Sequence, residues 1–431
     1  MRLRSAIRIT INVNAYERQI EALRSDSADL RTIGSYRSQP AAKTSACRKM
    51  ARGPVCDFDQ IRKATKALHQ TLGDAWCCAN ATHAEHAAKL CLQARVEDGV
   101  RLELALSCSK RAPDFSMKSD DDPPLWLYVR SITEISQKSP ATHTTLPPAC
   151  IGQTLNIHKK KKVRVQPGPS SMTIGRDLRQ SASFCDSLSM CTCLTLSEEC
   201  LGYLESSDDS LKQLKHLFYH RCAQKPAAKT TALEISLPAL LDQSRAAPGL
   251  LSVEDQLHLA YNLALSLLQL YSTPWLANDW RSRDIAIFQL TGQPLKEALS
   301  TAHVTTAFRK PVDAQVPTPP ASLESQGCSD EQIMYGVPNL MLFSLGIALL
   351  EIGHKQSLEG FRTPRDQNSI FTARRLAQRP SSLGQRYQMI AHRCLQCDFG
   401  CGSELDKEEL RSAVYTDVVC QLGEMLEAFK I

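Results

Sequence analysis

The most regular pattern of apolar and polar positions lies in residues 252–270. Most of these positions are apolar, which predicts a helix enclosed on most sides. Ser252, with Asp255 three residues later, indicates a capping box at its start, and Pro274 is expected to help end it. The polar positions recur at three- and four-residue steps and form one narrow stripe: Asp255, His258, Asn262, Ser266 and Gln269.

A second apolar stretch, residues 340–352, has no polar face and predicts a helix that is buried all round. Asn339 is placed to cap its start, and Gly353 is placed to end it. Small side chains within it would let a neighbouring element approach closely: Ser344, Gly346 and Ala348.

Helical spacing is also present on both sides of these two segments. Residues 59–94 carry apolar side chains at that spacing, and residues 209–222 also predict a helix. Three amphipathic helices are expected to close the chain, over about 370–379, 383–396 and 405–428.

Strand patterns are fewer. Alternation of apolar and polar residues over 100–107 predicts a half-buried strand. Further strand candidates are residues 125–129, 191–196 and 284–290. Because both helices and strands are expected, we expect an α+β fold.

We divide the chain into a basic, weakly ordered leader (1–56), an α+β part (57–240) and a helical part (241–431). The segment 109–187 is rich in Pro, Ser, Thr and Asp, so we expect long insertions there, as surface loops or disorder. Residues 311–330 form a Pro-rich loop by the same criterion. The longest apolar stretch is far shorter than the roughly 20 residues that a bilayer requires, so we expect no membrane span.

The charge is concentrated at the N-terminus. The chain has 51 basic and 45 acidic residues, a net charge of +6. The first fifty residues hold ten bases and four acids, which is the whole excess, so nucleic-acid binding by the folded part is not expected. The tail loosely fits a mitochondrial presequence, although it lacks a clean apolar face.

The basic run Lys159, Lys160, Lys161 and Lys162 lies within the insertions. It is interpreted as a solvated charge run on a loop, with nuclear import as the alternative. We therefore expect a cytoplasmic protein, with nuclear entry possible through these lysines.

The chain has 17 cysteines and no secretory signal, so the thiols are expected to be reduced and mostly buried. Two groups have some resemblance to zinc sites. Cys394, Cys397 and Cys401 have one C-x₂-C spacing but no second pair nearby. The other group contains Cys77, Cys78, His83, His86 and Cys91, with both histidines expected on one helix face. Buried thiols are the preferred interpretation of both groups, and no cofactor is expected.

The order of these parts resembles the C-lobe of a protein kinase. A buried helix ending in LLQLYSTPWL is followed by WRSRDIAIFQL, a loop and NLMLFSLGIALLEIG. Kinases have a helix, a catalytic loop, a short strand and a central helix of the type YSxGIxLLEL. The resemblance implies a protein-kinase-like fold with a mainly helical C-lobe and a reduced, insertion-rich, β-containing N-terminal part.

More closely, the chain is similar to a family of fungal proteins with a kinase-like C-terminal domain, some of which resemble incompatibility and cell-death signalling proteins. The similarity covers about 57–428 without the insertions. Some of these proteins carry a helical domain ahead of the kinase-like part, for which residues 1–56 leave no room. We expect that this domain is absent or that the gene model is truncated. The shared motifs contain Trp76, Cys77, Cys78, His86, Leu90 to Leu92, Thr273, Pro274, Trp275, Leu276, Trp280, Leu345, Gly346, Glu351, Cys394, Cys397, Asp398 and Phe399.

The groups that phosphoryl transfer requires are incomplete in the sequence. It contains no glycine-rich phosphate loop and no V-A-I-K strand. Asp284 is the one weak catalytic candidate. If Asp284 is aligned with the metal-binding Asn of kinases, the position of the catalytic base falls near Trp280 or Arg281. The Asp398-Phe399-Gly400 triplet follows the central helix by about fifty residues, so it is expected in a loop between C-terminal helices rather than at a magnesium site.

These observations favour a non-catalytic, kinase-like interaction or regulatory module with a protein partner. The alternative is a divergent ATP-dependent phosphotransferase with a rearranged site, and a metal-stabilised nuclear factor is a third, weaker possibility. Trp275 and Trp280 are expected in the core, the alternative being an exposed aromatic platform for a partner.

Overall fold

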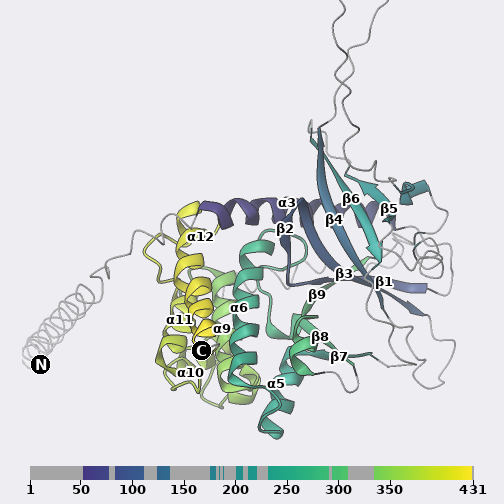
Figure 1. Ribbon diagram of the computed structural model, residues 1–431. Coiled ribbons are helices and arrows are strands. Elements are labelled where there is room, and N and C mark those ends of the chain that lie inside the picture. The colour runs from purple at the N-terminus through teal and green to yellow at the C-terminus, as the bar shows by residue number, and fades with distance from the viewer. Residues whose placement is uncertain are drawn as a thin grey trace, which may run out of the picture. The chain divides into compact units, whose positions relative to one another are not determined.

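The computed structural model describes residues 52–76, 83–110, 124–135, 175–180, 184, 188, 200–206, 212–220, 232–290, 294–308 and 334–429. The chain divides into two units, Met1–Arg52 and Gly53–Ile431. The elements named below belong to the second unit, apart from the first residue of α3 (Figure 1).

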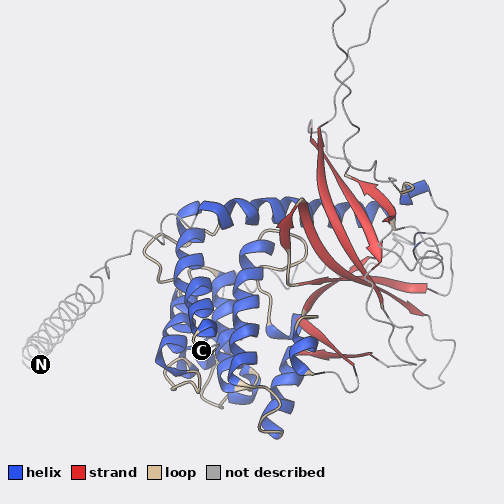
Figure 2. Cartoon of the chain, in the orientation of Figure 1, coloured by secondary structure: helices blue, strands red, loops and turns tan. Residues whose placement is uncertain are grey.

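The strands pair into one antiparallel sheet (Figure 2). Within the described ranges the sheet has nine strands in the order β5-β6-β4-β3-β1-β9-β8-β7, with β2 paired to β3 outside this path. Strands β8 and β9 follow the first long helix of the C-terminal half, so both halves of the chain contribute to the sheet. The strands are β1 (His83–Cys91), β2 (Arg95–Glu97), β3 (Gly99–Lys110), β4 (Leu125–Ile135), β5 (Cys200–Glu205), β6 (Lys212–His220), β7 (Ala232–Ser236), β8 (Ile285–Leu290) and β9 (His303–Phe308).

Helix α3 (Arg52–Ala75) contacts both the sheet and the helical part (Figure 1). At its C-terminal end the Trp76 ring stacks on His86 of β1 at 5.3 Å and on Phe308 of β9 at 5.1 Å. Towards its N-terminus the Phe58 ring lies 5.7 Å from Tyr415. The helix therefore ties one face of the sheet, the α3 face, to the C-terminal helices.

Helix α9 lies at the centre of the helical part and packs against α6, α10 and α11. Its side chains are buried almost without exception, as the absence of a polar face predicts. The helices are α5 (Leu237–Ala246), α6 (Val253–Leu270), α7 (Leu295–Leu299), α9 (Leu340–His354), α10 (Ser369–Leu376), α11 (Gly384–Gln396), α12 (Glu408–Val414) and α13 (Gln421–Glu427). A π-helical turn, Tyr415–Cys420, joins the last two, and 3₁₀ turns lie at η1 (Leu178–Gln180), η2 (Ser282–Asp284) and η3 (Leu358–Phe361).

The predicted starts of the two main helices are confirmed. The Ser252 hydroxyl accepts a hydrogen bond from the Asp255 N–H at 3.1 Å, and the Asp255 carboxylate accepts one from the Ser252 N–H. This is the capping box of α6. At the start of α9 the Asn339 side chain accepts a hydrogen bond from the Leu342 N–H at 2.9 Å. The three closing helical segments are also confirmed, as α10, α11 and the run from α12 to α13.

The predicted end of α9 is wrong by two residues. The helix continues through Gly353 to His354, and Lys355 takes the left-handed conformation with φ of 51°. Gly353 serves a packing purpose instead, because an added Cβ would lie 2.7 Å from the Ser381 hydroxyl and 3.0 Å from the Tyr387 ring.

The small residues of α9 allow the close approach that their size predicts. A Cβ at Gly346 would lie 2.7 Å from the Leu395 Cγ and 2.8 Å from the Leu395 backbone nitrogen, which belong to α11. A larger side chain would therefore push the two helices apart. The Tyr387 hydroxyl, also on α11, donates to the Leu349 carbonyl at 2.8 Å and closes the same interface.

Two helix predictions are wrong. The end of the segment 59–94 forms β1, and most of 209–222 forms β6. Both strands lie inside the sheet with a partner on each side, and β6 buries Lys215, Leu217 and Tyr219 on the face away from α3. A strand with side chains buried on both faces lacks clean alternation, so its sequence also fits a helix.

The segment predicted as insertions contains a central strand. β4 pairs with β3 on one side and β6 on the other, so the strand candidate at 125–129 is confirmed and extends to Ile135. The strand candidate at 284–290 is confirmed as β8. The candidate strand at 191–196, the loop at 311–330 and the lysine run at 159–162 lie outside the described residues.

The fold class is therefore mixed α+β, with a large antiparallel sheet and several helices. None of the helices in the described ranges is long and apolar enough to cross a membrane.

Candidate functional site

A buried cluster of charged side chains lies on the outer face of the sheet, the face opposite α3. The Lys89 ammonium on β1 and the His303 ring on β9 both contact the carboxylate of Glu234 on β7. His303 Nε2 lies 3.1 Å from Glu234 Oε1, and Lys89 donates to Glu234 Oε2. Three strands that are far apart in sequence are joined through this one carboxylate.

The hydrogen bonds place an acceptor at each ring nitrogen of His303. Its Nδ1 lies 2.8 Å from the carbonyl oxygen of Thr301, which can only accept. The hydrogen bond with His303, together with Lys89 and against the effect of burial, lowers the pKa of Glu234 to about 2, so the carboxylate is ionised and also accepts. Both ring nitrogens of His303 therefore face oxygen atoms, one from a carbonyl and one from a carboxylate.

The Phe288 ring packs against both Lys89 and His303. It stacks on His303 at 4.6 Å and lies 5.0 Å from the Lys89 ammonium. The Trp126 ring in turn meets Phe288 edge to face at 5.0 Å. Strand register brings these groups together, since β7 pairs Glu234 with Phe288 of β8. Phe288 therefore adds a cation–π attraction to the Lys89 ammonium.

The cluster is asymmetric in its exposure. The side chains of Lys89 and His303 are 9% and 0% exposed, whereas that of Glu234 is 38% exposed. A buried ammonium and a buried imidazole ring share one carboxylate at the edge of the site. Such an arrangement holds strands together and is costly to disrupt, because removing the acid would leave the Lys89 ammonium without a counter-charge.

The turn that follows α6 is packed into the core. The Trp275 and Trp280 side chains are buried, which confirms the core interpretation and contradicts an exposed platform. The Trp275 indole N–H donates to the Thr65 carbonyl of α3 at 2.8 Å. Thr273 donates to the Leu270 carbonyl at 2.6 Å and closes the end of α6. Of the other motif residues here, Leu276 is buried and Pro274 is exposed.

Asp284 is exposed, at the end of the η2 turn. Its Oδ2 accepts a hydrogen bond from the Arg281 N–H at 2.7 Å, so the carboxylate closes its own turn. Glu351 near the end of α9 packs beside the same turn. Burial raises the pKa of Glu351, although the Ser282 hydroxyl and the Leu358 N–H oppose this effect. The Leu358 N–H donates to Glu351 Oε1 at 2.6 Å, so Glu351 links η2 to η3.

The cysteine-rich motif forms the end of α11 and the loop after it. Burial raises the pKa of the Cys394 thiol well above its usual range, and Cys397 ends the helix with φ of 52°. The Cys397 thiol donates to the Gly402 carbonyl and the Cys401 thiol to the Phe399 carbonyl. Asp398 is exposed in this loop, between α11 and α12.

A family model matches residues 57–429, which is most of the chain, and its description is "Domain of unknown function (DUF7580)". The chain belongs to this family. A search of curated proteins found no match. The match begins inside α3 and ends after α13, so the DUF7580 domain includes the sheet, the charged cluster and the whole helical part.

The second zinc hypothesis for this DUF7580 domain assumed a helix that does not form. His83 and His86 lie on β1, which is a strand, so the shared helix face that the hypothesis required does not exist. Cys77 and Cys78 lie outside the described residues. Throughout the described ranges, no three His, Cys, Asp or Glu side chains gather as a metal site would require, Cys394, Cys397 and Cys401 included.

Sequence analysis missed all three members of the charged cluster in the DUF7580 domain. They lie in three separate strands, each of which also contains other polar residues: Lys89 in HAEHAAKLC, Glu234 in ALEIS and His303 in HVTTAF. No local pattern in these strands distinguishes the three residues. The cluster became visible only once the strand pairing was known.

Proposed function

We propose that this chain is a kinase-like module that acts by binding and does not transfer phosphate. The order of its elements supports this proposal. A sheet that packs against the long helix α3 is followed by α6, a turn, the strand β8, the buried helix α9 and further helices. The sequence resemblance to a kinase C-lobe rests on the same order of parts.

The non-catalytic part of the proposal rests on the contacts that Lys89 already makes inside the protein. Phosphoryl transfer uses a lysine on the phosphates and carboxylates on magnesium. Here the Lys89 ammonium lies buried against Glu234 and Phe288, and the His303 ring contacts the same carboxylate. The Asp284 carboxylate accepts a hydrogen bond from the backbone N–H of Arg281 in the same turn. These groups have structural partners already.

A specific observation favours the alternative, a divergent phosphotransferase. In the kinase pattern H-R-D-x-x-x-x-N the metal-binding Asn follows the catalytic Asp by five residues. With Asp284 in the place of the Asn, the base falls on Asp279, one residue before the position near Trp280 or Arg281 inferred from the sequence. Asp279 and Asp284 are both exposed in the turn after α6.

Thermal unfolding with nucleotide separates the two functions. We expect that ATP with Mg²⁺ leaves the melting temperature of the purified full chain unchanged and that no labelled phosphate reaches protein or water. A ligand at about 100 times its Kd would add roughly 2.7 kcal/mol of stability, so binding would be visible. A rise of several degrees that disappears in Asp279→Asn or Asp284→Asn, but persists in the exposed control Asp242→Asn, would overturn the proposal.

A further inference from the structure

The segment around α10 forms a basic surface. Between residues 359 and 380 there are five arginines and two acids, a net charge of +3. One acid, Asp366, forms an ion pair with Arg375 of the same segment. The other four arginines are exposed: Arg362, Arg365, Arg374 and Arg379.

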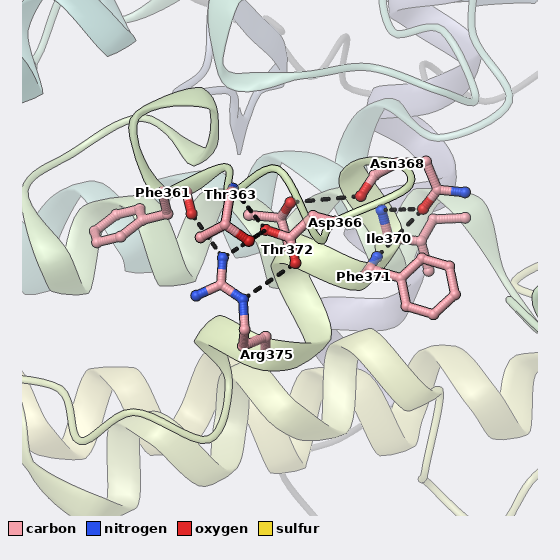
Figure 3. A network of polar contacts seen from close by, with 8 residues as sticks. All are labelled: Phe361, Thr363, Asp366, Asn368, Ile370, Phe371, Thr372 and Arg375. Carbon is pink, nitrogen blue, oxygen red and sulfur yellow. Dashed lines mark hydrogen bonds and ion pairs between the residues drawn. The ribbon is translucent and has the colours of Figure 1, made fainter.

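A polar network fixes the loop that carries two of these arginines (Figure 3). Arg375 on α10 donates through Nε and Nη2 to both oxygens of Asp366, and its Nη2 also donates to the Phe361 carbonyl at 2.6 Å. Asp366 accepts from the Thr363 N–H at 2.8 Å, and Asn368 caps α10. The loop between η3 and α10 is thus held at both ends, which fixes the backbone that carries its exposed side chains.

The exposed arginines have no acidic partner in the described part of the chain. Arg374 donates to the Tyr335 and Gly336 carbonyls at 2.6 and 3.1 Å, which leaves its positive charge uncompensated. Arg379 lies close enough to His354 to lower the pKa of that histidine, after the larger effect of burial. The surface defined by these arginines therefore offers several guanidinium groups to an anion.

Apolar side chains adjoin the arginines. Phe371 on α10 is 38% exposed, and Met334, which precedes α9, is 75% exposed. The Tyr335 ring lies edge to face on Phe371 at 5.4 Å, and Arg374 holds the backbone of Tyr335 beside the helix. One small area thus combines exposed apolar groups with unpaired cations.

We propose that this α10 surface binds an acidic segment of a partner protein, one that carries an apolar side chain among its carboxylates. Glutamate and aspartate match the planar guanidinium groups, and an apolar side chain would cover Phe371 and Met334. A nucleic acid would satisfy the arginines but would leave the aliphatic Met334 exposed. This inference rests on the proposed function, because it gives the binding module its class of partner.

Fluorescence anisotropy with defined peptides tests the inference. The probe is a short fluorescein-labelled peptide in which glutamates flank one leucine, and the matched probe replaces that leucine with serine. We expect the leucine peptide to bind the full chain more tightly, and its binding to weaken as salt rises from about 50 to 300 mM. Arg362→Glu combined with Arg365→Glu should weaken binding about tenfold or more, as should Phe371→Ala. Arg245→Glu, an exposed arginine of α5, should leave binding unchanged.

Three results would overturn the inference: no binding of either peptide, equal loss in Arg245→Glu, or equal affinity for the leucine and serine peptides. Tighter binding of duplex DNA or of phosphatidylserine vesicles, lost in the same α10 variants, would also overturn it and assign the surface to another class of ligand. Failure here leaves the nucleotide experiments on Asp279 and Asp284 unaffected, so the two proposals fail separately.

Discussion

Two histidines of the same sheet are fully buried, yet their polar contacts differ. His303 on β9 and His216 on β6 both have 0% exposure. Both nitrogens of His303 face acceptors, the Glu234 carboxylate and the Thr301 carbonyl. His216 has one partner in the described residues, the Ser131 hydroxyl at 2.7 Å, and its Nε2 has none.

The difference shows that two equally buried histidines can have very different polar surroundings. Burial, and to a smaller extent the nearby Arg179 guanidinium, lower the pKa of His216 to about 3, so that ring is neutral. Beside His303 lies an ionised carboxylate, which also contacts the buried Lys89 ammonium. The edge of the sheet at β7 therefore contains an ion pair, whereas the buried ring on β6 is uncharged.

Removing the acid should have the largest effect. Glu234→Gln leaves the buried Lys89 ammonium without a counter-charge and removes the carboxylate that His303 contacts, so we expect the free energy of unfolding to fall by about 3 kcal/mol. Chemical denaturation of the wild type and the variant at pH 7 measures it. Asp242→Asn on α5 removes an exposed carboxylate and should change stability little.

The contrary outcome is equally clear. If Glu234→Gln and Asp242→Asn were equally stable, the buried Lys89 and His303 would not depend on the carboxylate, and the cluster would not hold the strands together.

As the pH falls, His216 should be the first of the groups in this comparison to lower the stability. Its pKa is lower in the folded protein than in the unfolded chain, so the unfolded chain binds more protons between pH 6.5 and 3, and stability falls as the pH falls. One such group contributes up to about 1.4 kcal/mol per pH unit, or roughly 2 kcal/mol between pH 6.5 and 4.5. Glu234, also with a lowered pKa, adds to the loss below about pH 4.5.

Denaturation at a series of pH values checks this order. His216→Gln should make the slope between pH 6.5 and 4.5 shallower, while Glu234→Gln should change it mainly below pH 4.5. His69 and His354 also have pKa values lowered by burial, so some slope remains in His216→Gln. Constant wild-type stability from pH 7 to 5 would contradict a neutral His216.

The same contrast separates what the sequence predicts from what it cannot. Helices α6 and α9 were predictable because their burial and caps are local, as at Ser252 and Asn339. The β1 and β6 strands were not, since partners on both sides remove the alternation that identifies a strand. The charged cluster could not be predicted from the sequence, because Lys89 lies 145 residues from Glu234 and His303 lies 69 residues from it.

The smallest expected effect concerns the single partner of His216. Ser131→Ala removes a buried hydroxyl that is paired across β4 and β6, and it leaves both nitrogens of His216 without a partner in the described residues. We expect a loss of about 1 kcal/mol, because the ring is neutral and only one hydrogen bond is lost. Ser300→Ala is the matched control, since its hydroxyl also donates a hydrogen bond, to the Glu297 carbonyl, but at an exposed site. A loss in Ser131→Ala as large as that in Glu234→Gln would mean that His216 is charged, and the distinction between the two histidines would then be false.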